Sequence, residues 1–365
     1  MNSARTPQEI INFMREGAIF RDFGYMINQM CPGVDAAKIL SAGLCEITGE
    51  SYASVSRKVR NWFNGKNLPR SRETIFQICF ILKLNEAQSN VLTGRLSDTG
   101  IHYRNPEELA YAFALRTGRS YADALELKEK ALQLCAGAME IQGAPRPDIY
   151  TRQVKRAFDD VYTEGAFEQF FIEHGAELGS LHNTAYKKFV ELLDVLQSPE
   201  TYARSPERSY TLAEVMREYM QLHVPVQQRR GAKARNAVKM GDLDVYQKLI
   251  KKYWPSESTL IRMRSRSEDV DRKTLLLLYL ATEAFDDENE EDFDLYEDCE
   301  DDPDLLLEIR IEKMRLFLDE YGMNPLDPGN PFDFLVIYSM RTEEDEEARI
   351  RMEKVLELLF SDDME

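Results

Sequence analysis

Residues 54–61 concentrate side chains that can read the edges of DNA bases. The candidates for base contact are Ser54, Ser56, Arg57, Lys58, Arg60 and Asn61. Arginine pairs in a bidentate manner with guanine, and asparagine does the same with adenine. The cations that follow, Lys66, Arg70 and Arg72, suit contacts with phosphate. This segment therefore predicts a surface for double-stranded DNA, and the alternative is a solvated basic helix face without a ligand.

The elements that must position these side chains are helices joined by a glycine turn. Val59 and Trp62 have the helical spacing of residues that face a core. Gly65 supplies a left-handed turn, and Pro69 precedes a further helix that starts near Ser71. The apolar face of that helix is predicted to consist of Ile75, Ile78, Cys79 and Leu82.

The segment from Ser51 to Leu84 resembles the lambda-repressor-like helix-turn-helix domains of the xenobiotic-response-element class. The resemblance rests on Val59, Trp62, Gly65 and Pro69. The resemblance implies an N-terminal DNA-binding domain whose recognition helix precedes the glycine turn. Sequence spacing leaves two registers open. The small residue that begins the loop between the two helices is expected near Ala53, whereas the glycine lies at Gly49, about one helical turn earlier. Either the recognition helix begins early, near Ser51, or the first helix is 36–47 and the second helix is the short piece 51–55.

The rest of the chain shows helix signals and no strand pattern of comparable length. Thr6 with Glu9, and Thr211 with Glu214, form capping boxes, and Asn330 followed by a proline opens another helix. We expect an all-α fold, with a helix-turn-helix domain followed by a larger helical region, arranged as successive helical hairpins. The predicted segments are a helical lead (1–34), the helix-turn-helix domain (35–100), a helical domain (101–282), an acidic loop (283–304) and C-terminal helices that pack on the helical domain (305–365).

The net charge of −18 is unevenly distributed. Fourteen acidic residues and no basic ones lie between Glu283 and Asp304, whereas the segment from Ala36 to Arg95 has nine basic and four acidic residues. The segment 227–273 is also basic. One hypothesis is that the acidic loop competes with a partner for that second basic region, and the alternative is ordinary charged helix faces beside a solvated loop.

Motifs of catalysis are missing from the sequence, and we expect no enzyme, no catalytic residues and no cofactor. The five cysteines form no C-x-x-C pair and the four histidines lack ligand spacing, so no metal site is expected. The sequence has no signal peptide and no apolar run long enough for a membrane span, which predicts a cytoplasmic protein.

These observations lead to two functional hypotheses. The first is a DNA-binding transcriptional regulator whose helical C-terminal region dimerises or senses a protein partner or effector. The alternative is a non-enzymatic adaptor of a mobile element or phage-defence system, in which the helix-turn-helix is a scaffold for protein interaction. The whole chain also resembles uncharacterised helix-turn-helix proteins of low-GC Gram-positive bacteria and their mobile elements. This resemblance includes Trp254-Pro255-Ser256, the helix expected over 269–282 and Asn330-Pro331-Phe332-Asp333.

Overall fold

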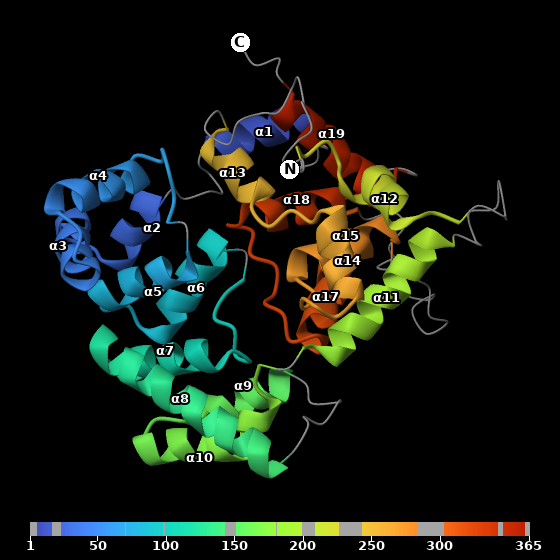
Figure 1. The fold of residues 1–365 in the computed structure, drawn as a ribbon. Helices are drawn as coiled ribbons and strands as arrows, with labels where there is room; N and C mark the ends of the chain where they lie inside the picture. Colours follow the sequence, from blue (N-terminus) through green and yellow to red (C-terminus); the bar gives the residue numbers. More distant parts are fainter. Residues whose placement is uncertain are drawn as a thin grey trace, which may run out of the picture. The chain divides into compact units, whose positions relative to one another are not determined.

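The computed structural model describes residues 6–16, 23–69, 71–97, 99–142, 151–179, 181–198, 209–225, 243–283, 303–341 and 346–361. Every regular element in these ranges is a helix, and none is a strand (Figure 1). The expectation of an all-α fold is therefore confirmed. In the same ranges, no helix combines the length and the apolar character that crossing a bilayer requires.

Internal contacts divide the chain into two compact units, which are described separately. Unit 1 comprises Met1–Phe20, Leu181–Asp319 and Pro325–Glu365, and unit 2 comprises Arg21–Ser180 and Glu320–Asn324. This grouping differs from the predicted segments, because residues 35–100 do not form a unit of their own. They share one continuous apolar core with helices that follow residue 100.

Unit 2 contains the predicted DNA-binding segment. Its helices are α2 (Phe23–Met30), α3 (Ala36–Thr48), α4 (Tyr52–Phe63), α5 (Arg72–Ile81), α6 (Glu86–Ser97), α7 (Pro106–Arg116), α8 (Tyr121–Gln142), α9 (Thr151–Asp159) and α10 (Glu164–His174), with a 3-10 turn at Gly175–Glu177. Helix α7 contacts α5, α6 and α8, and its residues Glu108 to Leu115 are all buried. The aromatic contact between Phe76 and Tyr111, with ring centroids 4.8 Å apart, joins α5 to α7 in this core.

Unit 1 is built from the N-terminal helix and the helices after residue 180. They are α1 (Pro7–Arg15), α11 (Asn183–Gln197), α12 (Leu212–Val215) with a π-helical turn at Met216–Met220, α13 (Val245–Lys251), α14 (Glu257–Arg264), α15 (Arg272–Ala281), α17 (Pro303–Glu320), α18 (Pro331–Ser339) and α19 (Ala348–Phe360). Helix α19 contacts α1, α15 and α18. The apolar stripe predicted in 183–197 is buried at each of its five positions, because it forms the inner face of α11.

Helix α15 is buried along most of its length, including two cations at its start. Arg272 makes a bidentate ion pair with Asp333 of α18, at 2.8 and 2.9 Å. The ammonium of Lys273 donates to the carbonyls of Ile250 and Lys252 at 3.1 and 2.6 Å. These two cations belong to the core of unit 1, which corrects their assignment to a basic surface. Residues 227–242 of that basic region, and residues 284–302 of the acidic loop, lie outside the described residues.

The helix starts read from the sequence are confirmed at three sites. Thr6 and Thr211 each accept a hydrogen bond from the backbone N–H of the glutamate three residues later, and each glutamate side chain reaches back to the cap. The side chain of Asn330 accepts from the backbone N–H groups of Phe332 and Asp333. These local signals succeed because both partners lie within one turn of chain.

Candidate nucleic-acid interface

Helix α4 follows α3 after a tight turn of residues 49–51. Gly49 has φ +69° and ends α3, because this left-handed conformation costs glycine little. Ser51 is the N-cap of α4 and accepts a hydrogen bond from the backbone N–H of Ser54. Helix α4 therefore starts at Tyr52, as the earlier of the two registers requires, and the segment 51–55 is not a separate piece.

One face of α4 is fixed in the core of unit 2. Val55, Val59 and Trp62 are buried, and the ring of Trp62 contacts that of Phe23 edge to face at 5.9 Å between centroids. Since these three positions recur at helical spacing, the opposite side of α4 faces outward. The core contacts hold α4 as a rigid support for its outward side chains.

Three of the predicted DNA contacts are exposed cations. Arg57 and Arg60 lie on α4, and Lys66 follows the left-handed Gly65 at φ +67°. None of the three forms an ion pair with any residue that the structure describes. The backbone carbonyl of Asn61 accepts from the N–H groups of Lys66 and Asn67, at 2.9 and 3.2 Å, which closes the end of α4.

The remaining side chains predicted on α4 have different surroundings. Ser56 donates to the carbonyl of Ala53 at 3.5 Å, within its own helix. Ser54 donates to a carboxylate oxygen of Glu50 at 3.1 Å, and the ammonium of Lys58 binds both oxygens of the same carboxylate at 2.6 and 2.7 Å. The hydrogen bond from Lys58, followed by that from Ser54, lowers the pKa of Glu50. Glu50 thus offsets the charge of Lys58, so α4 presents fewer free cations than its sequence indicates.

Arg72 lies at the start of α5 and points into unit 2, which corrects its assignment to a phosphate contact. Its guanidinium donates to both carboxylate oxygens of the buried Glu108, at 2.7 and 2.6 Å. It also donates to the Ser97 hydroxyl at 2.7 Å and to the carbonyls of Thr99 and Gly100, at 3.0 and 2.7 Å. An arginine with this many internal acceptors is a structural residue. Arg70 lies outside the described residues.

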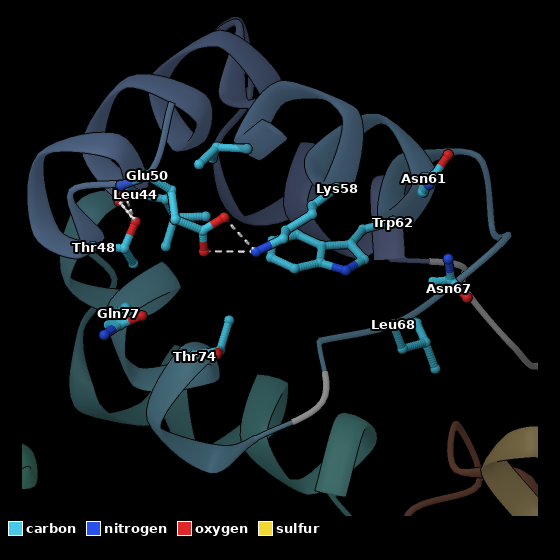
Figure 2. Close-up of a pocket in the computed structure, with 11 residues that line it drawn as sticks. Leu44, Thr48, Glu50, Lys58, Asn61, Trp62, Asn67, Leu68, Thr74 and Gln77 are labelled. Atoms are coloured by element: carbon cyan, nitrogen blue, oxygen red, sulfur yellow. Dashed lines mark hydrogen bonds and ion pairs between the residues drawn. The ribbon is translucent and has the colours of Figure 1, made fainter. Parts of the chain in front are cut away.

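A pocket of about 390 Å³ lies beside α4, between the end of α3 and the first two turns of α5. Figure 2 shows Trp62 and the Glu50–Lys58 pair on one side of the open space, with Thr74 and Gln77 of α5 on the other. Leu44, Val55 and Leu68 add apolar surface to the lining. Helix α4 thus carries the exposed Arg57 and Arg60 and also one wall of a pocket.

Sequence reasoning missed Glu50 and the pocket. Glu50 lies eight residues before Lys58, in the turn between α3 and α4 rather than on a helix, so no helical spacing connects the pair. The pocket depends on the tertiary approach of α5 to α4, for which the sequence has no local signal. Among the described residues, no group of three or more histidine, cysteine or acidic side chains has a geometry that could hold a metal ion.

No protein-family model, curated protein or solved structure matches this chain.

Proposed function

We propose that this chain is a DNA-binding regulator that places the outward side of α4 against double-stranded DNA. The observation that carries the proposal is the set of exposed cations Arg57, Arg60 and Lys66, which lack ion-pair partners within the described part of the chain. Exposed cations without acidic partners are free to replace the counterions of DNA phosphates. Arg57 and Arg60 belong to a helix that is fixed by buried side chains, and a rigid helix can enter a major groove without an ordering cost.

The distribution of charge supports a small footprint on DNA. The whole chain has a net charge of −18, so most of its surface repels a polyanion. Contact is therefore confined to the locally basic α4 and the turn after it. Arg57, Arg60 and the carboxamide of Asn61 are the groups we assign to base edges, and Lys66 is assigned to phosphate. Lys58 contributes less, because Glu50 already binds its ammonium.

The test is the affinity of the intact chain for the DNA upstream of its own coding sequence, measured by fluorescence anisotropy at several salt concentrations. The variant Arg57→Gln/Arg60→Gln should lose at least about tenfold in affinity for this DNA, and Lys66→Gln, at the assigned phosphate contact, should lower the slope of log K against log salt by about 1. The matched control is Lys128→Gln/Lys130→Gln on α8, which removes the same charge from two ion-paired lysines. Equal binding by the two double variants would refute the assigned face.

The alternative function, a protein-binding adaptor, has one structural observation in its favour. Leu125 and Leu132 on α8, two turns apart, are 38% and 37% exposed, and Ile172 on the contacting helix α10 is 49% exposed. Contiguous exposed apolar surface marks sites that bind another protein, and Leu125 and Leu132 lie on one face of α8. A stable complex captured without DNA, and lost in a Leu125→Ser/Leu132→Ser variant, would favour the adaptor over the regulator.

A further inference from the structure

The Glu50 carboxylate binds two side chains of α4 that are suited to holding phosphate. The ammonium of Lys58 contacts both of its oxygens, at 2.6 and 2.7 Å, as Figure 2 shows, and the Ser54 hydroxyl donates to one of them at 3.1 Å. Lysine and serine are among the side chains that contact DNA phosphates, and a phosphate, like a carboxylate, presents charged oxygens that accept from them. Glu50 therefore lies where a phosphate would find the same two donors.

Ser54 and Lys58 share one flank of α4. They are four residues apart, and residues at this spacing lie on the same side of a helix. Successive residues are rotated by about 100°, so Lys58 points sideways when Arg57 points straight outward. A helix in a major groove about 12 Å wide has a sugar–phosphate wall on each side. If Arg57 faces the bases, as the proposed function requires, Ser54 and Lys58 face one of these walls.

The ion pair between Glu50 and Lys58 is open to competition from DNA. The side chains of Glu50 and Lys58 are 39% and 50% exposed, so an external anion can approach both of them. An exposed ion pair of this kind is weak, and dissolved salt screens it. A DNA phosphate can therefore reach the ammonium of Lys58, but it must first displace the carboxylate.

From these contacts we propose that Ser54 and Lys58 form a subsite for a DNA phosphate and that Glu50 occupies this subsite in the free protein. The inference rests on the proposed DNA-binding function and adds a backbone contact to it. Glu50 acts as an internal competitor, because α4 reaches its full affinity for DNA only when the carboxylate leaves. Its effect extends to any duplex, since contacts with the phosphate backbone carry no sequence information.

The test is fluorescence anisotropy titration of the full chain carrying Glu50→Gln, with the DNA upstream of its own coding sequence, at several salt concentrations. The amide preserves the size of the side chain and removes the charge that holds Lys58. At about 0.1 M salt the affinity should rise at least about fivefold, and the slope of log K against log salt should steepen by about 1, because one more phosphate is neutralised. Glu50→Ala provides a second form of the same test.

Three further variants separate the subsite from a general effect of charge. Glu46→Gln removes an exposed carboxylate of α3 that forms no ion pair within the described ranges, and it should change the affinity by less than about twofold. In Glu50→Gln/Lys58→Gln, the gain in affinity and in slope should disappear. In Glu50→Gln/Ser54→Ala, the slope should stay steep while the affinity falls at least about twofold from that of Glu50→Gln. Circular dichroism melts verify that each variant is folded.

Three results would overturn the proposal. The first is an equal change of affinity in Glu50→Gln and Glu46→Gln, and the second is a gain that persists in Glu50→Gln/Lys58→Gln. In both cases the parent still binds DNA, so the subsite is refuted and the proposed function stands. The third is the absence of binding by the parent and by Glu50→Gln alike, which refutes the subsite and the DNA-binding function together.

Discussion

Replacing Arg72 by methionine tests whether this residue is structural, as its contacts indicate, or part of a DNA-binding surface. Methionine preserves much of the apolar stem and removes the guanidinium. The Glu108 carboxylate, which is 8% exposed, would lose both charged hydrogen bonds, and the carbonyls of Thr99 and Gly100 would lose their donor. We therefore expect a large loss of stability in unit 2.

The magnitude follows from the partial burial of the pair. Removing one partner of a buried ion pair typically costs about 3 to 5 kcal/mol. The side chain of Arg72 retains 21% exposure, so water can partly solvate the carboxylate that remains. We accordingly expect the free energy of unfolding to fall by about 3 kcal/mol. Arg57→Met, a matched change of an exposed arginine without an ion pair, should alter it by less than about 0.5 kcal/mol.

Urea unfolding followed by circular dichroism and tryptophan fluorescence provides the measurement. The variant Arg72→Met/Glu108→Gln, which also removes the orphaned charge, should recover at least about 1 kcal/mol relative to Arg72→Met. The reasoning would be refuted if Arg72→Met were as stable as Arg57→Met, or if the second substitution gave no recovery.

Three further predictions concern other parts of the two units. Asp333→Asn removes the buried ion pair between Arg272 and Asp333 and should lower the free energy of unfolding by about 3 kcal/mol. A loss below about 1 kcal/mol in urea titration would contradict this. Burial raises the pKa of the Cys79 thiol to about 12, so iodoacetamide at pH 8 should label half-buried Cys45 before Cys79, as peptide mass spectrometry can verify. Burial, followed by the hydrogen bond to Glu73, raises the pKa of Tyr121 to about 12. The resulting contribution to stability is complete below about pH 10, the ordinary tyrosine pKa, and is lost as pH rises towards about 12. In denaturant titrations, Tyr121→Phe should therefore reduce the loss of unfolding free energy between these pH values. An equal loss in the variant and the parent would disprove this prediction.

Sequence reasoning succeeded where the interacting groups lie within one or two turns of chain. The all-α fold, the caps at Thr6, Thr211 and Asn330, and the buried stripe of α11 all depend on local spacing. The inward orientation of Val59 and Trp62 follows from the same periodicity. Local rules could not separate the two registers, because both place a glycine turn near the start of α4.

Reasoning from sequence failed where a partner is distant along the chain. Arg72 and Glu108 are thirty-six residues apart, and Arg272 and Asp333 are sixty-one apart. No spacing rule relates such residues, so the sequence alone places both arginines in basic segments rather than in a core. The domain boundary at residue 100 is displaced for the same reason, since α7 completes a core that begins with α2 and α3.

For α4 itself, the sequence determined the residue types, the helical period and the glycine turn that follows. Tertiary structure decided which of its cations are free: Arg57 and Arg60 are exposed without ion pairs among the described residues, whereas Glu50 binds the ammonium of Lys58. It also created the pocket, because α5 approaches α4 closely enough to enclose space beside Trp62. The physical reason is that charge and hydrogen-bonding capacity depend on which groups meet after folding, and those encounters are set by the packing of whole helices.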